Sequence, residues 1–235
     1  MHCERRGNDS ERARTFRGFP SLKTKTVRRS DAAGEAYLQW SAPQADAIGR
    51  STNENGKVGH TWDGRGLKTE RAIKFKIRAT WFTPEVIRAS ARHAQLRSRL
   101  SDNETRVLVR EAENAGHTVM LVEIDPNEGS GVIPSDWEAF LQPKGASSNS
   151  SQGVRGVDTP DLRKLQALQG VMQRNYDFDR FWIVFPLLRS DGTPLFPSTA
   201  TEAELVVRIR DKEGKVRWRV PESICQRTRM LGKAN

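Results

Sequence analysis

The sequence is poor in cysteine and histidine, the residues that build disulfide frameworks and most structural zinc sites. It has 2 Cys and 4 His among 235 residues. Cys3 and Cys225 stand near opposite ends of the chain, so we expect neither a disulfide framework nor a CxxC metal site. The histidines have no i,i+4 pair and no cysteine partner, which argues against zinc ligation. We expect no cofactor.

Long apolar runs are also missing. No segment approaches the roughly 18 apolar residues that a membrane-spanning helix needs. Residues 1–30 contain no apolar stretch that could form the core of a signal peptide. As written, the chain is expected to have no transmembrane segment and to be cytoplasmic.

Familiar catalytic signatures do not occur either. The sequence has no phosphate-binding GxxxxGK(S/T), no GxSxG nucleophile elbow, no HExxH and no GxGxxG after a strand. We therefore expect a protein that is not an enzyme, and we assign no catalytic residues.

Positive charge is abundant, but it is concentrated at the two ends. The net charge is +10, of which residues 1–30 carry +6 and residues 221–235 carry +2. Such ends bind polyanions weakly and with a strong salt dependence. No helix-turn-helix, zinc-finger or RNA-recognition pattern accompanies the charge. Non-specific polyanion or nucleic-acid binding through the basic N-terminal tail is therefore kept as an alternative function.

Composition divides the chain into three parts. Residues 1–66 have scattered aromatics in a polar background without periodicity, and we predict that this basic N-terminal region is largely disordered. A short strand at residues 36–41 is the alternative there, since Tyr37, Leu38 and Trp40 could dock on the folded part. Residues 67–224 are predicted to form a single domain. Within it, the Ser- and Gly-rich residues 144–156 indicate a flexible loop. Residues 225–235 are expected to be a basic tail.

Helix signals are clearest in the middle of the chain. Thr83, followed by proline and glutamate, predicts the start of a helix over residues 84–99. Ser101 and Glu104 have the spacing of a capping box that begins a second helix, so the two form a hairpin. One further helix is predicted over residues 159–174.

Strand signals surround these helices. Apolar runs and alternating patterns predict strands at residues 72–82, 117–124, 135–141, 181–188, 204–210 and 216–220. Turns are expected at Asp191-Gly192 and at residues 212–215. In the last strand, Trp218 is expected to face the core between two outward arginines. Short strands with regular turns indicate an antiparallel β-sandwich, so the predicted fold class is α+β.

The order of these elements, together with residues 181–186, 191–196 and 205–209, resembles uncharacterised bacterial envelope proteins, often lipoproteins. The similarity covers residues 72–220. It implies an immunoglobulin-like β-sandwich with a helical insertion and brings no catalytic residues. Cys3 follows only two residues and cannot be the acylated cysteine of an export signal, so an envelope location would require a different start.

An acidic turn after residues 117–124 is the best candidate metal site. Its candidate oxygen ligands are Asp125, Asn127, Glu128 and Asp136, near Glu123. The spacing departs from an EF-hand, because Ser130 stands where that loop needs glycine. We interpret the segment as a strand-ending turn, with a cation-binding sandwich domain as an alternative function.

Aromatic residues could form a carbohydrate-binding platform or a core. The candidates are Trp81, Phe82, Trp137, Trp182 and Trp218. Their alternating placement among Ile and Val favours core packing. The leading expectation is thus a non-enzymatic interaction or structural module with an unknown protein partner.

Overall fold

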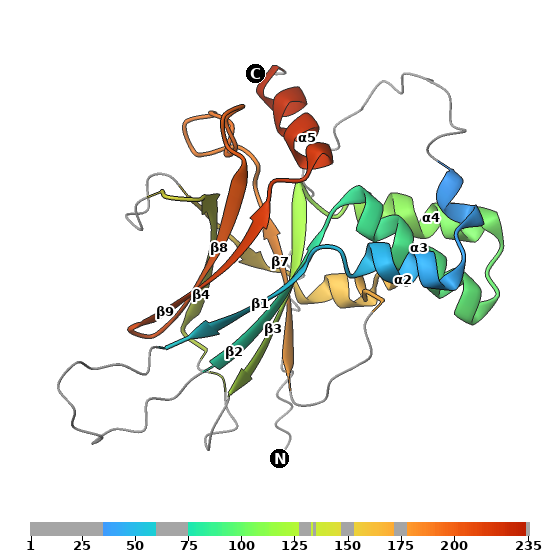
Figure 1. The fold of residues 1–235 in the computed structure, drawn as a ribbon, viewed down its shortest axis with the longest axis horizontal. Coiled ribbons are helices and arrows are strands. Elements are labelled where there is room, and N and C mark those ends of the chain that lie inside the picture. The colour runs from blue at the N-terminus through green and yellow to red at the C-terminus, as the bar shows by residue number, and fades with distance from the viewer. Residues whose placement is uncertain are drawn as a thin grey trace, which may run out of the picture. The chain divides into compact units, whose positions relative to one another are not determined.

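In the computed structural model, nine strands of the described residues form one antiparallel sheet that is nearly barrel-shaped (Figure 1). The structure describes residues 35–59, 75–126, 133, 135–146, 153–171 and 178–233, all within one compact unit. The strands are β1 (Asn53–Val58), β2 (Phe75–Phe82), β3 (Thr118–Pro126), β4 (Trp137–Pro143), β5 (Val154–Arg155), β6 (Val157–Asp158), β7 (Asp179–Phe185), β8 (Glu202–Ile209) and β9 (Lys212–Arg219). Their order across the sheet is β5-β4-β8-β9-β1-β2-β3-β7-β6.

A single glycine joins the two ends of this sheet. β5 and β6 lie at opposite ends of the strand order, yet only Gly156 separates them in the chain. The Gly156 N–H donates to the Ala139 carbonyl of β4 at 2.9 Å. On the other side, a Cβ at Gly156 would overlap Ile183 and lie 2.6 Å from the Phe185 ring, both on β7. The closing segment therefore crosses from β4 to β7 at a position where only glycine fits.

The opposite side of the sheet also has a narrow junction. β1 and β9 share a single registered pair, Val58 with Gly214. A Cβ on Gly214 would overlap the carbonyl of Lys57, and one on Gly56 would lie 2.8 Å from a Val216 methyl group. Glycine thus permits the close approach of the two strands here.

Alternate side chains of the strands fill the interior of the sheet. The ring centroid of Trp81 lies 5.9 Å from those of both Phe196 and Trp218. The largest fully buried side chains are Trp81, Phe185, Ile77, Met120, Ile124, Leu141, Leu168, Ile183, Leu187, Leu195, Leu205 and Ile209. All of these except Leu168 belong to this inner core.

Helices cover the outer face of β2, β3 and β7, on one side of the sheet in Figure 1. They are η1 (Ala36–Gln39), α2 (Ala42–Gly49), α3 (Pro84–Ser98) and α4 (Asp102–Glu113). Thr83 and Ser101 cap α3 and α4, as predicted from sequence. A second core lies between these helices and Leu121, Val119 and Trp182 of the sheet. The predicted helix hairpin is confirmed.

The N-terminal and C-terminal boundaries differ from the sequence prediction. Within residues 1–66, the segment 35–58 is folded, and its Tyr37, Leu38 and Ala45 are buried. Residues 1–34 and 60–74 lie outside the described part of the chain. The expected basic tail, residues 225–235, largely belongs to α5 (Glu222–Lys233), where Ile224 and Thr228 are buried. Residues 35–58 and α5 have few apolar residues. Both segments are ordered because these few residues pack against strands or helices that are distant in the chain.

Three local predictions are corrected as well. The single helix over 159–174 is replaced by η2 (Pro160–Lys164) and η3 (Gln166–Leu168), because Leu165 between them is extended, with ψ 111°. The turn predicted at 212–215 lies at residues 210–211 instead, where Arg210 adopts a left-handed φ of 55°. The predicted loop 144–156 contains β5, and residues 147–152 lie outside the described part. The α+β class with an antiparallel sheet is confirmed, whereas the immunoglobulin-like sandwich is not.

Closure at Gly156 gives a stability prediction. Gly156→Ala should lower the free energy of unfolding by about 1–3 kcal/mol, because the added methyl group overpacks the contact with β7. Gly153→Ala is the matched control, since its Cβ would lie 3.3 Å from Gln142, and its effect should stay within about 1 kcal/mol. Urea unfolding of both variants measures the difference. Equal losses would contradict the closure argument.

Candidate functional site

The candidate metal residues are not brought together in the described part of the chain. Asp125 lies at the end of β3 and pairs with Lys76 at 3.8 Å. Asp136 is exposed just before β4, and Asn127 and Glu128 lie outside the described residues. Among the described residues, no group of three or more His, Cys, Asp or Glu side chains could hold a metal ion. Cation binding by this turn stays a prediction.

Glu123, which the sequence placed near the candidate metal ligands, forms ion pairs with two arginines instead. Its side chain is only 1% exposed on β3, on the same side of the sheet as the helices. Arg78 of β2 donates to both carboxylate oxygens, at 2.6 and 2.9 Å. Arg180 of β7 donates to one of them at 3.0 Å, and the guanidinium of Arg78 also lies 4.9 Å from the Phe178 ring centroid. Glu123 thus links three neighbouring strands.

A second buried carboxylate, Glu204, occupies the outer face of β8. Its side chain is 2% exposed, and Arg217, Gln142 and Lys215 surround it at 2.9, 3.2 and 3.3 Å. Burial alone would raise the pKa of Glu204. The hydrogen bonds from these three side chains outweigh burial and hold the pKa below its usual value.

Three tryptophans are core residues, as the alternation predicted. The indole N–H groups of Trp81, Trp182 and Trp218 donate to Thr118 Oγ1, the Leu168 carbonyl and the Thr52 carbonyl, at 2.6, 2.8 and 2.8 Å. Along β9 the burial alternates, so Trp218 faces inward and its arginine neighbours face outward. These residues, with the buried Phe82, form no exposed platform.

Trp137 differs from these three. It is half-buried at the start of β4, and its ring packs edge-on against Phe181 of β7, with centroids 4.6 Å apart. Among the described residues, no group accepts a hydrogen bond from its indole N–H. The Trp137–Phe181 contact bridges the same two strands that Gly156 joins.

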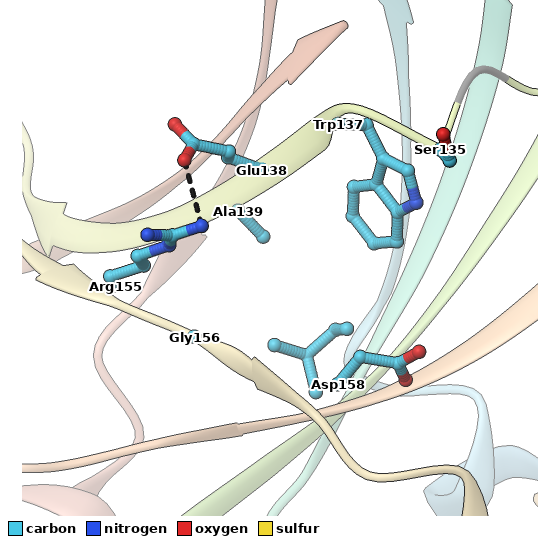
Figure 2. Close-up of a pocket in the computed structure, with 8 residues that line it drawn as sticks. Ser135, Trp137, Glu138, Ala139, Arg155, Gly156 and Asp158 are labelled. Atoms are coloured by element: carbon cyan, nitrogen blue, oxygen red, sulfur yellow. Dashed lines mark ion pairs between the residues drawn. The ribbon is translucent and has the colours of Figure 1, made fainter.

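A shallow hollow of about 210 Å³ lies at this seam between β4 and the closing segment (Figure 2). It is lined by Ser135, Trp137, Glu138, Ala139, Arg155, Gly156, Asp158 and Ile183. The hollow forms because the closing segment leaves β4 at Gly156 to pair with β7. β5 pairs with β4 only at Phe140 and Leu141, so Trp137 and Glu138 have no strand partner on this side among the described residues.

Two carboxylates border the hollow, and only one of them has an ion-pair partner among the described residues. Glu138 pairs with Arg155 at 2.8 Å, as the dashed line in Figure 2 marks. Asp158 forms no ion pair with any cation of the described part. Partial burial raises the pKa of Asp158, and a hydrogen bond from the Thr159 backbone offsets some of this effect. The lining therefore carries one uncompensated negative charge beside an indole ring.

Sequence reasoning missed most of this site. The sequence indicates Trp137 as an aromatic candidate. It predicts a flexible loop at Arg155 and Gly156, and it gives Asp158 no role. The only available signal was the short run Val154-Arg155-Gly156-Val157-Asp158, whose β-branched residues flank a glycine. Nothing in that run indicates that its two halves pair with strands at opposite ends of the sheet.

The described histidines do not form an acid–base site. At the start of β3, His117 Nδ1 accepts a hydrogen bond from the Leu187 backbone at 3.4 Å. Burial, assisted by the nearby Arg227, lowers the pKa of His117. His93 is half-buried on α3, whereas His2 and His60 lie outside the described residues.

No helix of the described part is long and apolar enough to cross a membrane.

Loss of the Glu123 charge should destabilise the protein strongly. Glu123→Gln leaves Arg78 and Arg180, whose side chains are mostly buried, without a counter-charge. We expect a loss of about 3 kcal/mol in unfolding free energy. Asp125→Asn on the same strand removes only the longer pair with exposed Lys76 and should cost less than about 1 kcal/mol. Chemical denaturation measures both, and a small effect of Glu123→Gln would refute this assignment.

Glu204 should contribute stability that depends on pH. Its lowered folded-state pKa means that the contribution is present above the unfolded-state value of about 4.3 and is lost as pH falls through the folded-state value. Glu204→Gln should therefore cost about 1–2 kcal/mol at pH 7, because Arg217 and Lys215 can still reach water.

The matched control for this variant is Glu202→Gln. It removes an exposed pair with Lys144 and should cost less than about 1 kcal/mol at any pH. Unfolding of the wild type and both variants between pH 3 and 7 measures the effect. The gap between wild type and Glu204→Gln should close at the acidic end, and a gap that widens there would contradict the prediction.

No protein-family model, no curated protein and no solved structure matches the chain. Function is therefore inferred from the geometry of the chain's own residues.

Proposed function

We propose that the chain is a non-enzymatic interaction or structural module that recognises a protein partner through its outer surface. The observation that supports this is the filled interior of the sheet. Trp81, Phe185 and Met120 are fully buried there, together with leucines and isoleucines from most of the strands. A barrel whose interior is packed with side chains offers its surface and its seams for binding.

The buried charges support the same proposal. Glu123 and Glu204 are each held by two basic side chains on neighbouring strands. These carboxylates are neutralised by partners of the same sheet and fix the relative positions of the strands. Such rigid strands suit a module that presents a fixed surface.

We extend the proposal to the type of module: an immunoglobulin-like domain of the bacterial envelope. Such a domain would carry a helical insertion between two of its strands. The α3–α4 hairpin, inserted between the adjacent strands β2 and β3, fits that description. The two glycine junctions, at Gly156 and at Gly214, divide the strands into two groups that face each other across one core, which also fits a sandwich-derived fold.

Two measurements on the full chain test the proposal. The first follows ester, phosphoester, glycoside and peptide substrates by absorbance, with heat-unfolded protein as the control. The second titrates a hydrophobic dye, 8-anilinonaphthalene-1-sulfonate, against tryptophan fluorescence. We expect no turnover above the control and no stoichiometric dye uptake, because the interior is filled. Turnover by the folded chain, or stoichiometric uptake that quenches the core tryptophans, would overturn the proposal.

A further inference from the structure

We infer that the hollow at the β4–β7 seam binds the cationic side chain, lysine or arginine, of a partner protein, between the indole of Trp137 and the carboxylate of Asp158. The inference rests on the proposed function, because it names the chemistry by which the module would recognise its partner.

The two groups that define the site lie on either side of the opening. Figure 2 shows the indole of Trp137 and the side chain of Asp158 extending toward the same space from β4 and β6. An indole face attracts cations through its quadrupole, and a carboxylate attracts them by charge. The combination of both groups in one hollow selects a cation that also has an apolar stem, since Ile183 and Ala139 contribute apolar lining.

Charge within the hollow favours a positive ligand. Arg155 neutralises Glu138 at 2.8 Å, which leaves Asp158 as the carboxylate without an ion-pair partner among the described residues. Asp158 is exposed on β6, and partial desolvation of its carboxylate raises its pKa. An incoming ammonium or guanidinium group would form an ion pair with this carboxylate.

The size and openness of the hollow favour a side chain over a larger ligand. A volume of about 210 Å³ is below the range of roughly 300–1,000 Å³ typical of small-molecule pockets. The adjacent edge of β4, at Trp137 and Glu138, has no strand partner on this side in the described part. A peptide backbone that delivers the cation can therefore approach this edge.

The test uses the full chain and short peptides of matched shape. The probes are acetyl-Gly-Lys-Gly-amide and acetyl-Gly-Arg-Gly-amide, and the uncharged control is acetyl-Gly-norleucine-Gly-amide. Binding is followed by the NMR signal of the Trp137 indole N–H, assigned by its disappearance in Trp137→Phe. We expect this signal to shift saturably with a cationic peptide and to shift little with the norleucine peptide.

Two variants locate the binding site. Asp158→Asn should lower the affinity for the cationic peptides about fivefold, because it removes one partly exposed ion pair. Asp136→Asn, an exposed acid next to the hollow that does not line it, should leave the affinity unchanged. Both variants should keep the wild-type thermal midpoint within a few degrees, which separates lost binding from lost folding.

Each outcome decides the inference. Preference for a cationic peptide that depends on Asp158 supports it. If n-butylammonium alone binds equally well, the cation is still recognised, but the source need not be a protein, and the partner assignment is overturned. Equal shifts with norleucine, or an unchanged affinity in Asp158→Asn, overturn the site. None of these results bears on turnover or dye uptake, so failure of the inference is distinguishable from failure of the proposed function.

Discussion

Closure of the sheet by one five-residue segment is the constraint on which the structure depends. Residues 154–158 pair first with β4 and then with β7, and Gly156 is the point at which they change partner. Without this segment, β4 and β7 would be open strand edges next to the inner core. Because the segment carries only two paired residues on each side, it closes the sheet and at the same time leaves the hollow beside Trp137.

The charged residues of the sheet follow from the same geometry. A nearly closed sheet has an inner face for apolar side chains, so polar residues of the same strands must lie on the outer face. There, neighbouring strands place Arg78, Glu123 and Arg180 side by side, and Gln142, Glu204 and Arg217 likewise. Helices cover one of these outer faces, whereas the face of β4, β8 and β9 carries a ladder of paired charges. The outer face of these three strands is therefore mainly polar, and at the hollow an aromatic ring lies near an acid that has no ion-pair partner among the described residues.

Local sequence signals predicted the elements that are determined by short-range chemistry. The caps at Thr83 and Ser101 and the alternation of β9 follow from contacts within a few residues, and each is present. The predictions were wrong where an element owes its existence to distant partners. Residues 36–49 have no periodic pattern, but Tyr37 and Leu38 are buried against the α3–α4 layer. Leu165 is extended and interrupts a pattern that had the spacing of a helix, and Leu162 and Leu168 on either side of it are both buried in the second core.

The sequence by itself determined the α+β class, the helix hairpin and the alternation that sends Trp81, Trp182 and Trp218 into the core, because burial of apolar side chains and helix capping act locally. Tertiary structure alone decided how the sheet closes and which charges are compensated. The reason is physical: strand pairing joins residues far apart in the chain, such as Phe140 with Arg155 and Glu123 with Arg180. Asp158, which has no ion-pair partner among the described residues, and the half-buried indole of Trp137 come close only because the closing segment places them on the two sides of one seam.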